Sequence, residues 1–192
     1  MDALLTSTLL VALAEIGDKT QLLSFVLAAR LRRPWAIIAG IFVATVANHA
    51  LAGSVGAWVA SLLSPEILRW SVGILFIAFG LWTLKPDTLD DDETPKTLAR
   101  GAFITALIAF FLAEIGDKTQ FATVALAARF DSLAAVVLGT TLGMMIANVP
   151  AVLLGDRIAN RIPVRVVHAI AAAIFAVLGI ATLLGAGGSL GF

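Results

Sequence analysis

Two identical nine-residue segments contain the side chains of this chain with the clearest chemical potential. Residues 13–21 and residues 112–120 both read Leu-Ala-Glu-Ile-Gly-Asp-Lys-Thr-Gln, at an offset of 99 residues. Each copy lies inside a long apolar stretch. A charged group at the depth of a hydrocarbon core is costly, and such groups usually face a cavity, a partner or an ion path. The repetition therefore predicts one site that is built from two halves of the chain.

The oxygen atoms of both copies suit a hard divalent cation. On a continuous helix, the Glu, Asp and Gln of each copy are three residues apart and lie within an arc of roughly 120°. Carboxylate and amide oxygens are the ligands that Ca²⁺, Mg²⁺ and Mn²⁺ take in proteins. If the two segments face each other, we expect a metal site made of six residues: Glu15, Asp18, Gln21, Glu114, Asp117 and Gln120.

The charges of the motif predict what could replace the cation. Four carboxylates together with Lys19 and Lys118 carry a formal charge of −2, which one divalent cation would neutralise. Crowded carboxylates cannot all stay ionised after the cation leaves, so protons could take its place. The alternative is that each Glu forms an ion pair with the Lys four residues later and only fixes helix packing. Gly17 and Gly116 could interrupt the helices and expose backbone carbonyls as further ligands.

Three further polar residues lie in the middle of other apolar segments. Asn48 and His49 share one segment, and Asn148 aligns with His49 at the same offset as the motif copies. We expect all three to line the same cavity, with His49 as a metal ligand or a proton carrier. Hydrogen bonding between helices is the alternative for these side chains.

The elements that must position these residues are membrane-spanning helices. Sixty per cent of the 192 residues are hydrophobic and 14% are charged, with a mean hydropathy of +1.00. A soluble domain has about 25% charged residues. The net charge of zero gives no basic surface for nucleic acid, and the lack of cysteine excludes disulfides and thiolate metal sites. Six segments approach the roughly 20 apolar residues of a spanning helix: 3–29, 35–60, 67–84, 101–128, 132–154 and 166–186.

The positions of lysine and arginine predict the orientation of these six helices. The loops after the first, third and fifth segments hold nine Lys and Arg residues, and the opposite side holds two. This puts the three loops in the cytoplasm and both termini outside. Because each half has three spans, the halves insert in opposite directions, as two inverted three-helix repeats. We expect an all-α membrane protein with repeats at 1–84 and 101–192, joined by an acidic cytoplasmic linker at 85–100.

At the doubled motif the chain resembles a family of cation transporters. Its members carry two copies of Glu-x-Gly-Asp-(Lys/Arg)-(Thr/Ser), one in the first span of each three-span half. They include bacterial manganese exporters, thylakoid manganese transporters and Golgi Mn²⁺/Ca²⁺:H⁺ antiporters, a branch of the wider cation/Ca²⁺ exchanger group. The resemblance covers nearly the whole chain, and it implies that the acidic residues form the cation site. The matching residues are Glu15, Gly17, Asp18, Lys19 and Thr20, and then Glu114, Gly116, Asp117, Lys118 and Thr119.

Several functions remain compatible with the sequence. The leading hypothesis is a multi-pass plasma-membrane transporter that exports Mn²⁺ from the cytoplasm in exchange for protons, with oligomerisation left open. A Ca²⁺/H⁺ antiporter would use the same residues. A passive channel would use the carboxylates as a selectivity ring, and a membrane assembly factor would use the motif as a protein contact. The chain has no Ser-His-Asp set, P-loop or zinc motif, so we expect neither an enzyme nor a cofactor.

Overall fold

The computed structural model describes residues 2–85, 101–154 and 164–185, and every regular element in these ranges is a helix. The greater part of the predicted linker lies outside the described residues. The helices are α1 (Asp2–Glu15), α2 (Lys19–Leu31), α3 (Pro34–Leu62), α4 (Pro65–Thr83), α5 (Gly101–Glu114), α6 (Lys118–Arg129), α7 (Leu133–Leu154) and α9 (Val164–Leu183).

Local sequence signals explain where several helices begin. Pro34 and Pro65 stand at the first positions of α3 and α4, where the missing N–H would have no helical partner in any case. Ser64 caps α4, because its hydroxyl accepts a hydrogen bond from Ile67 N at 3.4 Å. Four helices, α3, α4, α7 and α9, are long and apolar enough to cross a membrane.

Each segment that contains the motif is two helices rather than one. The helix breaks after Glu15 and again after Glu114, and a new helix begins at Lys19 and at Lys118. The glycine inside each break has a left-handed backbone, with φ of 85° at Gly17 and 77° at Gly116, which a residue with a side chain rarely adopts. The predicted interruption is confirmed. The arrangement of Glu, Asp and Gln along one face of a continuous helix is wrong, because these residues lie on both sides of the break.

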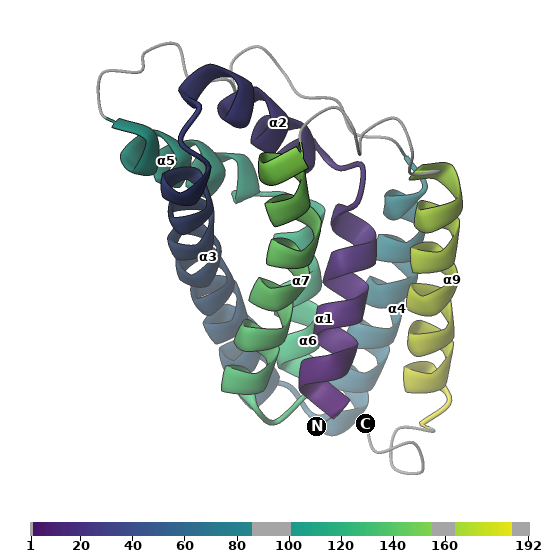
Figure 1. Ribbon diagram of the computed structural model, residues 1–192. Coiled ribbons are helices and arrows are strands. Elements are labelled where there is room, and N and C mark those ends of the chain that lie inside the picture. Colours follow the sequence, from purple (N-terminus) through teal and green to yellow (C-terminus); the bar gives the residue numbers. More distant parts are fainter. Residues whose placement is uncertain (1, 86–100, 155–163, 186–192) are drawn as a thin grey trace.

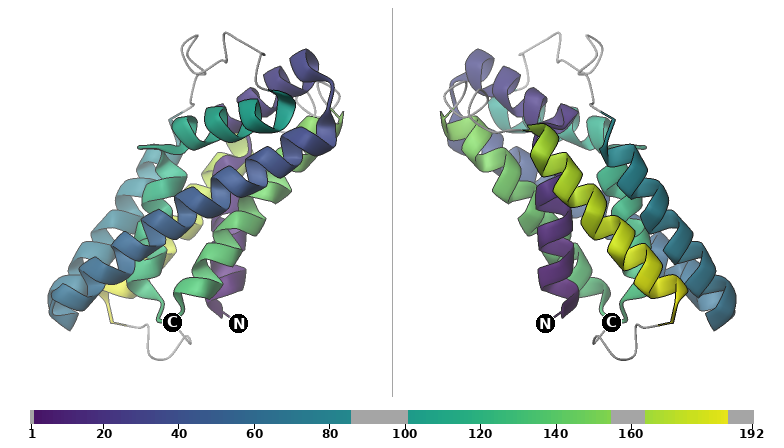
Figure 2. Two further views of the ribbon diagram at one scale, coloured as in Figure 1. Left: turned by 90° about the vertical axis from the view of Figure 1, so that its left-hand side faces the viewer. Right: turned by 90° about the vertical axis from the view of Figure 1, so that its right-hand side faces the viewer.

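The helices form a bundle with two crossing helices at one end. In Figure 1, α1, α4, α6, α7 and α9 run between the lower and upper ends, and α2 and α5 lie across the upper end. Helix α1 begins and α9 ends at the lower end. Figure 2 shows that α3 is strongly inclined as it passes along one side of the bundle. It has 29 residues, more than any other described helix.

Two separate hydrophobic cores hold the bundle together. The lower core joins α1, α4, α6, α7 and α9, whereas the upper core joins α2, α3, α5 and α7. The lower core contains Leu10, Ala14, Val72, Phe76, Phe79, Ala122, Ala125, Leu126, Ala127, Val136 and Phe175. The upper core contains Leu23, Leu27, Ile37, Ile41, Ala44, Ala106, Ala109, Phe110, Ala113 and Val152. Helices α4 and α9 thus pack against α1 and α6, the lower helix of each pair that contains the motif. None of their described residues belongs to the upper core.

Two glycines at equivalent positions of the halves let helices approach closely. A Cβ atom on Gly40 of α3 would lie 2.6 Å from Phe103 O of α5, and one on Gly139 of α7 would lie 2.6 Å from Leu4 O of α1. Both the glycines and their carbonyl neighbours are 99 residues apart, the offset of the motif. Close contact of small residues is typical of helix packing in lipid.

Large apolar side chains cover much of the outer surface. Trp35 is 74% exposed, Trp58 is 63% exposed and Val177 is 65% exposed. Exposure of so many large apolar side chains is unfavourable in water and is matched by hydrocarbon chains. The described residues therefore form an all-helical protein of the membrane.

Candidate cation site

Four helix ends meet where the two motif copies lie. Glu15 and Glu114 are the last residues of α1 and α5, while Asp18 and Asp117 stand directly before α2 and α6 as their N-caps. All four carboxylates are buried, with exposed fractions of 0% to 4%. The partial positive charge of a helix N-terminus stabilises an adjacent carboxylate, so α2 and α6 both favour negative charge at this point.

The two glutamines of the motif hold the breaks in shape. Gly17 N donates a hydrogen bond to Gln21 Oε1 at 2.8 Å, and Gly116 N donates one to Gln120 Oε1 at 2.9 Å. The Nε2 group of Gln21 donates to a backbone carbonyl of α7 at 3.0 Å, and that of Gln120 donates to Asn48 Oδ1 at 3.0 Å. The amide oxygens that we expected as ligands therefore bind backbone N–H groups in this structure.

Three of the four carboxylates form a tight cluster. One oxygen each of Glu15, Glu114 and Asp117 lies within 4.8 Å of the other two. Oε2 of Glu15 and Oε1 of Glu114 are buried and have no hydrogen-bond partner among the described residues. Buried carboxylates with unpaired oxygens require a compensating positive charge or a proton. Oxygen sets of this kind bind hard divalent cations.

The fourth carboxylate pairs with a lysine from the other copy. Lys118 Nζ lies 2.9 Å from Asp18 Oδ1, and the two side chains are 2% and 0% exposed. In the reciprocal pair, Lys19 Nζ lies 3.8 Å from Asp117 Oδ1, and the Lys19 side chain is 18% exposed. Both ion pairs join one half of the chain to the other.

The secondary polar residues lie next to the motif glutamates. Asn148 Nδ2 donates to Glu15 Oε1 at 3.2 Å, and His49 Nε2 lies 3.6 Å from Glu114 Oε2. Asn48 is further from the glutamates, since the motif residue that it contacts is Gln120. The structure thus brings all three secondary residues to the site, two on α3 and one on α7.

Sequence reasoning missed two residues that contact this region. Ser24 Oγ donates to Asn148 Oδ1 at 2.7 Å, and His168 Nε2 lies 2.7 Å from Ile16 O inside the first break. The signal for Ser24 was a second hydroxyl, that of Thr123, at the same offset of 99 residues. No sequence signal connects His168 with the motif, because it lies in another helix far along the chain.

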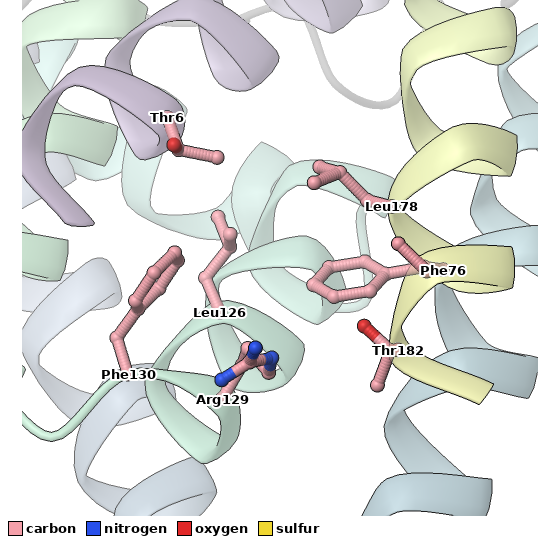
Figure 3. A pocket seen from close by; sticks show the side chains of 8 residues that line it. Thr6, Phe76, Leu126, Arg129, Phe130, Leu178 and Thr182 are labelled. Atoms are coloured by element: carbon pink, nitrogen blue, oxygen red, sulfur yellow. The ribbon is translucent and has the colours of Figure 1, made fainter. Parts of the chain in front are cut away.

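A small cavity lies away from the carboxylates, in the lower half of the bundle. Its volume of about 10 Å³ is enough for one water molecule. Figure 3 shows the Arg129 guanidinium among apolar and hydroxyl side chains from α1, α4, α6 and α9. No motif residue lines it. The lining residues are Thr6, Phe76, Leu126, Arg129, Phe130, Leu178, Ala181 and Thr182.

Comparison with protein families gives a match that covers most of the chain. The family is described as "Divalent cation/proton antiporter GDT1", and it matches residues 3–91 and 102–189. The two matched stretches each contain one copy of the motif.

Individual relatives match over nearly their full length. A Vibrio cholerae protein named "Putative manganese exporter" is 51% identical over 183 residues, which is 95% of this chain and 90% of that protein. "GDT1-like protein 5" of Arabidopsis thaliana is 31% identical, with 90% and 91% covered. "GDT1-like protein sll0615" of Synechocystis is 30% identical, with 91% and 93% covered. No solved structure matches the chain.

Proposed function

Because this chain belongs to the GDT1 family of divalent cation/proton antiporters, we propose that it exports Mn²⁺ from the cytoplasm across the plasma membrane in exchange for protons. The observation that carries this proposal is the cluster of Glu15, Glu114 and Asp117, whose oxygens lie within 4.8 Å of one another in a buried site. The name of the Vibrio cholerae relative favours Mn²⁺ as the ion.

The exchange follows from competition for the same oxygens. A divalent cation satisfies the three clustered carboxylates, with Asp18, Gln21 and Gln120 as the further proposed ligands. When it leaves, protons compensate the buried charge, because a buried carboxylate without a partner is costly. Metal affinity is therefore expected to fall as the pH falls on the loaded side. An inward proton gradient then drives export by displacing metal at the outer face.

The site also fits a carrier of six spans built from two inverted repeats. In this arrangement α1 with α2 forms the first span and α5 with α6 the fourth, each broken at the motif. Broken helices at the midplane and inverted repeats recur in secondary transporters. The equivalent close approaches at Gly40 and Gly139 support the repeat.

The proposed topology places the lower end of the bundle outside the cell. A cysteine at Ser61, in the last turn of α3, should then react with an impermeant reagent from outside, and one at Lys85 should react only from the cytoplasm. The chain has no cysteine of its own, so no background substitution is needed. Labelling of both positions from the same side would contradict the proposed topology.

The transport proposal is tested with purified protein in proteoliposomes. Mn²⁺ flux should follow an imposed pH gradient, protons should move when Mn²⁺ is added, and excess Ca²⁺ should compete weakly. Dominant competition by Ca²⁺ would favour a Ca²⁺/H⁺ antiporter with the same site. Metal flux that ignores the pH gradient and moves no protons would favour a passive channel, in which the carboxylates act as a selectivity ring.

A further inference from the structure

Lys118 places a fixed positive charge inside the candidate cation site. It is the first residue of α6 and follows the cluster residue Asp117 in the chain. Its ammonium group lies 2.9 Å from Asp18 Oδ1, and both side chains are almost fully buried. A pair this close and this well shielded from water is a strong electrostatic contact.

The position of Lys118 accounts for a difference between the two aspartates. Asp117 belongs to the cluster of three carboxylates, whereas Asp18, its equivalent in the first copy, is outside that cluster. The lysine near Asp117 is Lys19, which is 3.8 Å away and partly exposed. An ammonium group at hydrogen-bond distance competes with a metal ion for the same carboxylate oxygen. Asp18 is therefore held by a cation of the protein, and Asp117 is available to a cation from solution.

We propose that Lys118 acts as a built-in counter-ion of the site. Its ammonium group pairs with Asp18 in the metal-free carrier, and this ion pair breaks when metal binds. This inference rests on the proposed transport function and concerns the same site. Metal entry draws Asp18 into the ligand set and displaces the ammonium group. When the metal leaves, Lys118 returns to Asp18, so one buried carboxylate is compensated without an ion from solution. This lowers the barrier for the empty carrier to reorient, because uncompensated buried charge is costly.

The proposal separates three measurements that a packing role would change together. In Lys118→Gln, Mn²⁺ should bind about tenfold more tightly, since a competitor for Asp18 is gone. Exchange of labelled for unlabelled Mn²⁺ should persist, because it needs only the loaded carrier to reorient. Net export driven by a pH gradient should fall by about tenfold or more, because the empty carrier returns slowly. Lys118→Arg, which keeps the charge, should restore much of the net export.

Lys19→Gln is the matched control. It removes the equivalent lysine of the first copy, whose ion pair is longer and more exposed, so its effect on binding and on net export should be clearly smaller. The partner side is tested with Asp18→Asn, which should weaken Mn²⁺ binding. In the Asp18→Asn background, Lys118→Gln should no longer tighten binding, because the two groups act on each other. If Lys118→Gln alone fails to fold, net export by the double variant is compared with net export by Asp18→Asn instead.

Two outcomes would overturn the inference while leaving the transport proposal intact. One is a folded Lys118→Gln protein with wild-type net export. The other is a parallel loss of binding, exchange and export, which would make Lys118 a residue that only holds the two copies together. Absence of Mn²⁺ and Ca²⁺ transport by the wild-type protein would instead contradict the proposed function, so the two failures are distinguishable.

Discussion

The two motif copies have the same nine residues but different neighbours. The break at Gly17 is covered, because a Cβ atom on this glycine would clash with Val164 at the start of α9. The break at Gly116 is open on this side, since no atom of the described residues lies within 4 Å of a Cβ placed there. The two glutamates differ as well, with an asparagine against Glu15 and a histidine against Glu114.

The hydroxyl groups of the copies differ in the same way. The Thr119 hydroxyl lies 3.1 Å from Glu114 Oε2 and 3.0 Å from Asp117 Oδ2, and it shares its single hydrogen between these two acceptors. Thr20, its equivalent, is buried and makes no hydrogen bond to any described residue. Identical sequences thus reach different local states, because the rest of the chain surrounds them differently. A carrier that alternates between two orientations needs such a difference, since each orientation must treat the two halves unequally.

The largest expected effect tests whether both copies serve one site. Glu15→Gln and Glu114→Gln should each lower Mn²⁺ export by about a hundredfold or more, because each removes a buried ligand charge from the same cluster. Efflux from proteoliposomes measures this directly. Glu66→Gln is the control, since Glu66 is an exposed glutamate in the first turn of α4. Near-normal flux in either motif variant, at normal expression, would mean that the copies do not share a site.

The difference between the two breaks predicts unequal costs for the same substitution. Gly17→Ala and Gly116→Ala should each cost about 1–2 kcal/mol in the free energy of unfolding, because alanine is strained at positive φ. Gly17→Ala should cost a further 1–3 kcal/mol, roughly, from the clash with Val164. Thermal unfolding in detergent compares the two. The double variant Gly17→Ala/Val164→Ala should recover the second part, and equal destabilisation by both single variants would refute the predicted asymmetry.

The threonine pair gives a smaller test on binding. Thr119→Val removes the one hydroxyl that donates to the Glu114 and Asp117 carboxylates and should change Mn²⁺ affinity by about tenfold, given the usual strength of a hydrogen bond to a charged group. Thr20→Val removes none of the described hydrogen bonds and should leave affinity within about twofold. Equilibrium titration with Mn²⁺ resolves this difference, and equal effects would show that the asymmetry plays no part in binding.

The smallest effect is expected when the two motif glutamates are given the same type of neighbour. His49→Asn places on α3 the residue type that Asn148 supplies on α7, so the maximal rate should change by less than about fivefold. The pH dependence of transport should flatten, because asparagine cannot take up and release a proton as histidine can. Initial rates of export at a series of pH values provide the measurement. An unchanged pH profile would exclude His49 as a proton carrier.

The types of the site residues could be predicted from sequence, but not their pairing. The duplicated Glu and Asp stood out because charge at mid-depth is costly, and Gly17 and Gly116 indicated the breaks. The exchange of lysines between Asp18 and Asp117 could not be foreseen, since it depends on how α2 and α6 meet in space. The structural difference between the two copies could not be predicted either, because their amino-acid sequences are identical. It arises from Val164, His49 and Asn148, which belong to other helices.

The length of α3 links this carrier to the thickness of its membrane. A helix of 29 residues measures about 43 Å, whereas a hydrocarbon core is about 30 Å thick. The inclination of α3 in Figure 2 shortens its extent along the bundle, and the exposed Trp35 and Trp58 mark levels near its two ends. A thicker bilayer would draw α3 upright and a thinner one would tilt it further. Because α3 carries Asn48 and His49, a change in lipid chain length is expected to alter the tilt of α3 and so to move these two side chains relative to the cation site.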